Sequence, residues 1–90
     1  MRRLESRLFR INDRLSELVE EARLAGAELE MLRHIDDDAR RDAAVTDNPL
    51  DRDDARETAR DVARFEKVLA DIADERDELE AKRDRLLGKL

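Results

Sequence analysis

Acidic side chains are the most numerous groups in this sequence that could bind a cation, and they gather in two clusters, residues 36–38 and residues 51–54. Three consecutive aspartates on a helix point in different directions, so the first cluster could not converge on one ion. The second cluster lacks the glycine and the closing glutamate of an EF-hand loop. We therefore expect no metal site and no cofactor.

His34 is the only histidine, and the sequence contains no cysteine. A catalytic triad would need a nucleophile and a carboxylate held around this histidine in an enclosed pocket. The long helices predicted below offer no such pocket, so we expect His34 to lie on the surface and the protein not to be an enzyme.

Arginine supplies the other candidate chemistry. Arg76 and Arg83 fall on the apolar stripe of the second predicted helix, where they could bind an anionic ligand such as a nucleotide or serve as polar layers that set the register. More arginines gather near the middle of the chain, interleaved with acids and without aromatic neighbours: Arg40, Arg41, Arg52, Arg56 and Arg60. Because the net charge is -6 and base stacking needs aromatic side chains, nucleic-acid binding is a poor fit.

The elements that position these groups follow a heptad pattern. Steps of four and three residues from Leu4 to Ala43 meet apolar side chains at every position except Asp36. A second stripe runs from Ala55 to Leu90, and its polar positions are Thr58, Arg76 and Arg83. A repeat sustained over about six heptads is typical of a coiled coil rather than of disorder.

A break between the two stripes surrounds Pro49, which cannot continue a helix but suits the first position of a new one. Asp47 or Asn48 could cap that helix, and Asp51 is a further candidate cap. The sequence therefore predicts an all-α protein with one domain, residues 1–90. It consists of a helix over about 3–45, a turn over about 46–50 and a helix over about 51–88.

Folding the chain at Asp47 brings the two stripes together as an antiparallel coiled coil. Stripe residues whose numbers add to 94 then face each other, so Leu29 meets Phe65 and Asp36 meets Thr58. Arms of about 40 residues predict a rod about 60 Å long.

Apolar residues also flank the stripes, which indicates a helical bundle rather than a lone pair of helices. Neighbouring residues on one edge carry like charges, with Arg14 near Lys82 and Glu21 near Glu75. That edge is basic at the open end and acidic towards the turn, so two copies laid head to tail would match in charge. We expect a homodimer, a four-helix bundle whose interface includes Val19, Glu28, Ile35, Val68, Ala73 and Leu87.

The turn end of the hairpin, which we call the tip, is acidic: Asp47, Asp51, Asp53 and Asp54. A long hairpin ending in the run from Asp51 to Ala55 resembles in architecture the bacterial transcript-cleavage and stringent-response factors that insert such a tip into the secondary channel of RNA polymerase. The resemblance covers about a quarter of the chain, and it implies a tip that contacts a protein partner.

Three functions are compatible with this pattern. The first is a non-enzymatic interaction or scaffold protein that homodimerises and binds a partner protein. The second is a transcription regulator whose acidic tip or face binds RNA polymerase or a sigma factor. The third is a helical bundle that binds an anionic ligand. No apolar stretch is long enough to span a membrane, and the absence of cysteine fits the cytoplasm.

Overall fold

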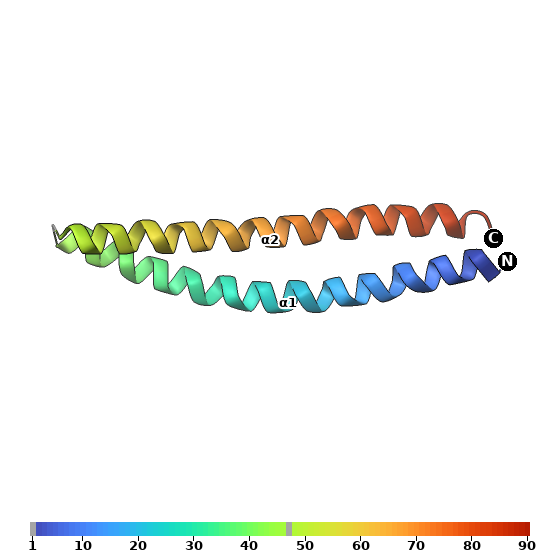
Figure 1. The fold of residues 1–90 in the computed structure, drawn as a ribbon, viewed down its shortest axis with the longest axis horizontal. Coiled ribbons are helices and arrows are strands. Elements are labelled where there is room, and N and C mark those ends of the chain that lie inside the picture. The colour runs from blue at the N-terminus through green and yellow to red at the C-terminus, as the bar shows by residue number, and fades with distance from the viewer. Residues whose placement is uncertain (1, 47) are drawn as a thin grey trace.

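The computed structural model describes residues 2–46 and 48–90, and it contains two long helices, α1 (Arg2–Val45) and α2 (Pro49–Leu87). The helices lie side by side in opposite directions, and the two ends of the chain lie together at one end of the rod (Figure 1). The molecule measures 67 × 16 × 13 Å. The predicted all-α helical hairpin is confirmed, and its length is close to the expected value.

The turn follows the rules for a residue that precedes proline. Asn48 is extended, with φ -91° and ψ 124°, because the ring of Pro49 disfavours the helical conformation before it. The Asn48 side chain accepts a hydrogen bond of 3.0 Å from the backbone N–H of Leu50, so it caps α2. Helix α2 begins at Pro49 rather than near residue 51, because the first helical position needs no N–H donor. The alternative cap and expected fold point, Asp47, lies outside the described residues.

Asp51 does not cap α2 but connects the start of α2 to the residue that follows α1. Its carboxylate contacts the hydroxyl group of Thr46, the residue that follows α1. The backbone N–H of Thr46 donates to the carbonyl of Asp42 at 3.0 Å, which extends the last turn of α1. Side chains from both helices therefore hold the connection.

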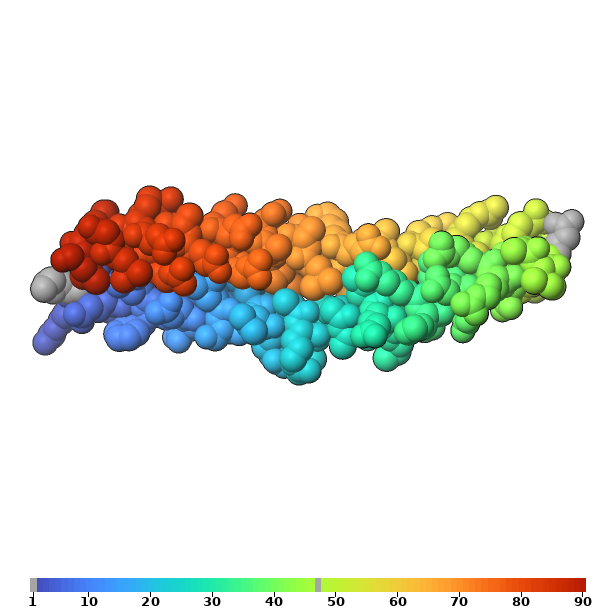
Figure 2. Space-filling model, turned by 180° about the vertical axis from the view of Figure 1, so that it is seen from behind, coloured from blue at the N-terminus to red at the C-terminus, as the bar shows by residue number. Residues whose placement is uncertain are grey.

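The predicted stripe of α1 is the side of that helix that α2 covers. Every stripe position from Leu4 to Ala43 is buried or half-buried, and Leu18 is the most deeply buried at 1% exposure. In α2, Leu86 is buried and most other stripe positions are half-buried. Side chains of the two helices meet along the visible face in the space-filling view (Figure 2). Across residues 2–46 and 48–90, no helix has the apolar length that crossing a bilayer needs.

One charged layer crosses the apolar seam, and it fixes the register. Asp36 is 6% exposed, and the Thr58 hydroxyl lies 2.9 Å from its Oδ1 atom. The Arg40 guanidinium forms an ion pair with Oδ2 at 3.1 Å, so both carboxylate oxygens have a polar partner. The predicted contact between Asp36 and Thr58 is confirmed, and with it the register in which facing residue numbers add to 94.

This layer predicts opposite results for single and paired substitutions. We expect Thr58→Val to lower the free energy of unfolding by about 1–2 kcal/mol, because the buried carboxylate loses a donor. The pair Asp36→Leu and Thr58→Val should be at least as stable as the wild type, because an apolar layer replaces a buried charge. Urea denaturation followed by far-ultraviolet circular dichroism tests both, and an unchanged midpoint for Thr58→Val would contradict the assignment.

Gly26 lies in the middle of α1, and a Cβ atom added there would meet no heavy atom within 4 Å. No contact within this hairpin therefore requires the lack of a side chain at Gly26, and glycine lowers the stability of the helix. We expect Gly26→Ala to raise the free energy of unfolding by about 0.5–1 kcal/mol, measured by the same denaturation. A loss of stability would instead indicate that another chain approaches the helix closely at this residue.

Candidate interaction surfaces

The hairpin has two faces that flank the seam on opposite sides. We call one the Ile35 face, because it carries the positions equivalent to Ile35 in the heptad repeat: Glu21, Glu28, Ile35, Asp42, Asp54 and Val68. We call the other the Arg33 face, and it carries Arg33, Arg40, Ala59 and Glu66. In an antiparallel pair, the like edges of the two helices share one side of the seam.

The predicted dimer interface is divided between these faces. Glu28, Ile35 and Val68 line grooves of the Ile35 face, whereas Val19, Ala73 and Leu87 occupy the heptad positions of the Arg33 face. The six residues therefore do not form one surface, because the two heptad positions that flank the seam lie on opposite sides of the hairpin.

An apolar groove lies in the middle of the Ile35 face. It is lined by the apolar residues Leu24, Ala25, Phe65, Val68 and Ile72 together with Glu21 and Glu28. Leu24 is 56% exposed and Val68 is 38% exposed. Large apolar side chains in a continuous groove are a common mark of a protein-binding surface.

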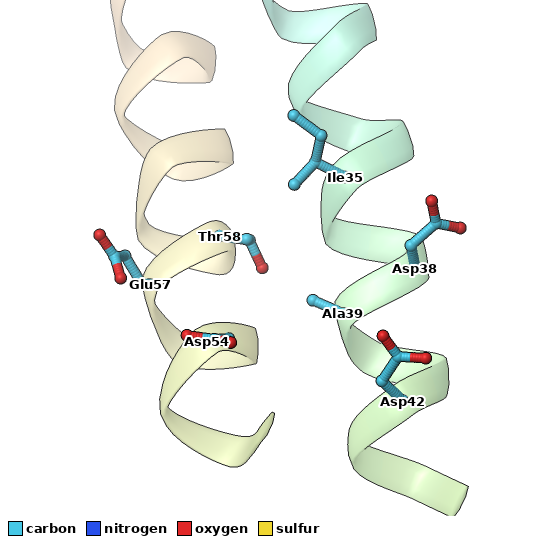
Figure 3. Close-up of a pocket in the computed structure, with 7 residues that line it drawn as sticks. All are labelled: Ile35, Asp38, Ala39, Asp42, Asp54, Glu57 and Thr58. Atoms are coloured by element: carbon cyan, nitrogen blue, oxygen red, sulfur yellow. The ribbon is translucent and has the colours of Figure 1, made fainter. Parts of the chain in front are cut away.

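Towards the tip, the Ile35 face becomes acidic. In Figure 3, Ile35, Ala39 and Thr58 point into the space between the helices, while carboxylates surround them. These carboxylates belong to Asp38, Asp42, Asp54 and Glu57. Asp38 lies 3.6 Å from Arg41, but within the described residues no cation lies at ion-pair distance from the other three.

The predicted tip residues do not act as one group. Asp51 is turned towards Thr46, and Asp53 pairs with Arg56 at 2.9 Å. Asp54 is exposed and belongs to the acidic end of the Ile35 face. Asp47 cannot be placed with them, since it is outside the part of the chain that the structure describes.

At the open end, the same face is basic. Six exposed cations occupy the heptad positions equivalent to Ile35 and Leu24 at this end: Arg3, Arg7, Arg10, Lys82, Arg85 and Lys89. None of the six is within ion-pair distance of a carboxylate of residues 2–46 or 48–90. Arg7, Lys82 and Lys89 flank the seam, as the heptad pattern predicts, whereas Arg3, Arg10 and Arg85 lie one position further from it and extend the basic surface.

Arg14 lies between the basic end and the apolar groove, and it changes the expected charge pattern. Its guanidinium forms a two-pronged contact with Glu75 on α2, with Nε–Oε2 at 2.6 Å and Nη2–Oε1 at 3.0 Å. It also contacts Glu17 at 3.0 Å and Glu21 at 3.1 Å. The expectation that Arg14 pairs unfavourably with Lys82 is wrong, because the long side chain reaches the carboxylate one heptad away.

These contacts shift the acidity of the groups involved. Hydrogen bonds from Arg14 lower the pKa of Glu75 below its ordinary value near 4.5, because they stabilise the carboxylate. The hydrogen bonds that Arg14 donates to Glu75, Glu17 and Glu21 raise the pKa of Arg14. The cluster therefore links α1 and α2 only while Glu75 is ionised.

Several cations elsewhere are paired with carboxylates. On the Arg33 face, Arg33 lies 3.8 Å from Glu66. Arg76 is exposed rather than covered by the seam, and it lies 3.9 Å from Glu80 of its own helix. Arg83 is half-buried and lies 3.2 Å from Asp84. Because neighbouring carboxylates occupy both seam arginines, the structure gives no support to an anionic ligand held by them.

The described residues contain no group of three or more His, Cys, Asp or Glu side chains that could hold a metal ion. His34 is exposed on α1. No protein family, no curated protein and no solved structure matches this chain. The geometry of the two faces is therefore the basis for a functional proposal.

The lowered pKa of Glu75 predicts a pH dependence of stability. A carboxyl group with a lower pKa in the folded state stabilises the fold above its unfolded pKa, and this contribution is lost as the pH falls through the folded value. We expect Glu75→Gln to lower the urea midpoint near neutral pH, and the two proteins to converge as acid protonates Glu75. Glu78→Gln is the control, because Glu78 has no cation partner among the described residues. Equal sensitivity of both variants at neutral pH would contradict the assignment.

Proposed function

We propose that this protein is a non-enzymatic coiled-coil interaction protein, which forms a homodimer and binds a partner protein. The observation that supports this most directly is that large apolar side chains outside the seam are exposed on both faces of the hairpin. Ile35 is 46% exposed and Val19 is 66% exposed, and they lie on opposite faces. A single seam between two helices buries little surface for 90 residues, so covering a second face would stabilise the fold.

The two faces suit different roles. The Ile35 face combines an apolar groove with charges that lack partners, and we assign it to self-association. The Arg33 face and its neighbouring positions carry Val19, Leu87 and Phe9, with Phe9 68% exposed, and we assign them to a partner protein. We propose a cytoplasmic location, because a chain without cysteine has no disulfide bond that the reducing environment there would break.

A second candidate function is regulation of transcription through the tip. It is supported by the exposed carboxylates of Asp53 and Asp54 beside the turn. A transcription assay with purified RNA polymerase would test it, with Asp53→Lys and Asp54→Lys as the paired change. The regulator hypothesis requires a loss of the effect on transcript yield, with the helical content unchanged.

The proposed homodimer predicts a face-specific response to charge. Replacing Ile35 and Val68 by lysine should convert a dimer into a monomer, because two charged groups per chain would enter the interface. Val19→Lys is the matched control on the Arg33 face, and it should leave the dimer intact. Sedimentation equilibrium gives the mass, and circular dichroism checks that the helices persist. A monomeric wild-type protein over the micromolar range would refute self-association.

A further inference from the structure

We propose that two copies pack through their Ile35 faces in antiparallel orientation, so that the tip of each copy covers the open end of the other. This arrangement rests on the homodimer proposed above, and it specifies the surface, the orientation and the point where the twofold axis crosses the rod.

Charges without an ion-pair partner among the described residues concentrate by sign at the two ends of the Ile35 face, with Glu28 and Glu78 between these ends. At the open end, the six exposed cations have no carboxylate within ion-pair distance in the described chain. At the tip, Asp42, Asp54 and Glu57 have no cation at that distance among residues 2–46 and 48–90. Both groups lie on the same face, at opposite ends of a rod 67 Å long. A surface of this kind is complementary to a second copy of itself turned end for end.

The position of the apolar groove supports the same arrangement. The register set by Asp36 and Thr58 places Lys82 and Arg85 level with residues 12 and 9 of α1, and Asp54 and Glu57 level with residues 40 and 37. The six cations lie at the levels of residues 3 to 12 of α1 and the three carboxylates at the levels of residues 37 to 42, so the midpoint between the two groups falls near Leu24. Leu24 and Val68 belong to the apolar groove, so matching the charges also brings the two grooves together at the axis.

Charge at the centre of this interface is partly balanced within each copy, although Glu28, which lines the groove, has no cation at ion-pair distance among the described residues. Arg14 holds Glu21 at 3.1 Å and Glu75 at 2.6 Å, so two of the glutamates beside the groove already have a cation. A parallel pair would instead place tip against tip, and the carboxylates would repel one another. A face 67 Å long and 13–16 Å wide offers on the order of 1,000 Å², enough for the roughly 800 Å² per partner that stable interfaces bury.

A charge-swap experiment on the full chain tests the orientation. The tip variant carries Asp42→Lys and Asp54→Lys, and the open-end variant carries Arg7→Glu and Arg10→Glu. Each variant alone should dimerise about tenfold or more weakly than the wild type at low salt, because like charges then meet at both ends of the interface. An equimolar mixture should recover the wild-type affinity as a heterodimer, which native mass spectrometry identifies by mass.

The combined variant, with all four substitutions in one chain, should also recover the dimer, because its two ends are again complementary. All substituted residues are exposed, and circular dichroism of each variant checks the helices. If the mixture and the combined variant both stay as weakly associated as the single variants, the antiparallel arrangement is overturned. A tip variant that pairs with wild type more tightly than wild type pairs with itself would indicate a parallel dimer.

A crosslink locates the axis. The chain has no cysteine, so Leu24→Cys introduces a single thiol, and mild oxidation should yield a disulfide-linked dimer because residues at a twofold axis lie beside their own mates. Val45→Cys is the control: it is also exposed, but it would face the open end of the other copy and should not crosslink. Crosslinking at Val45 and not at Leu24 would overturn the proposal.

These experiments separate the two proposals. A wild-type protein that remains monomeric refutes both the homodimer and its arrangement. A wild-type dimer that the charge swaps do not affect, and that Leu24→Cys does not crosslink, leaves the homodimer in place and removes only the antiparallel Ile35-face interface.

Discussion

The register between α1 and α2 is the constraint on which the other features of this molecule depend. The seam is apolar along most of its length, and apolar contacts alone distinguish poorly between alignments that differ by one heptad. The buried carboxylate of Asp36 does distinguish them, because in this alignment the hydroxyl group of Thr58 on α2 donates a hydrogen bond to it. The same alignment places the charges and the groove of the Ile35 face at their present levels.

The seam and the turn could be predicted from the sequence, because both follow from strong local rules. A repeat of four and three residues identifies the covered side of each helix, and Pro49 permits a helix to begin but not to continue. The contact between Asp36 and Thr58 followed from combining these rules. The first residue of α2 was placed about two residues late, since several aspartates near Pro49 are all acceptable as caps.

The surfaces were predicted less well, because they depend on the reach of side chains and on three-dimensional sidedness. Residues were paired by their level along the rod, which set Arg14 against Lys82. Arg14 is level with residue 80 of α2, and Glu75 lies five residues from that level. Five residues of helix correspond to about 7.5 Å, a distance that an arginine side chain can bridge to reach Glu75. The exposed apolar residues are likewise divided between two faces, because the two edges of the seam lie on opposite sides of the hairpin.

The common position of the two chain ends has a mechanical consequence. Tension applied through both ends would act at one end of the rod and peel the helices apart in sequence, instead of sliding them along each other (Figure 1). The layer of Leu8 and Leu86, near the chain ends, would separate early. The layer of Asp36 and Thr58, towards the turn, would separate late. Such a geometry breaks one layer at a time, so the hairpin would open under a smaller force than a pair of helices loaded in shear.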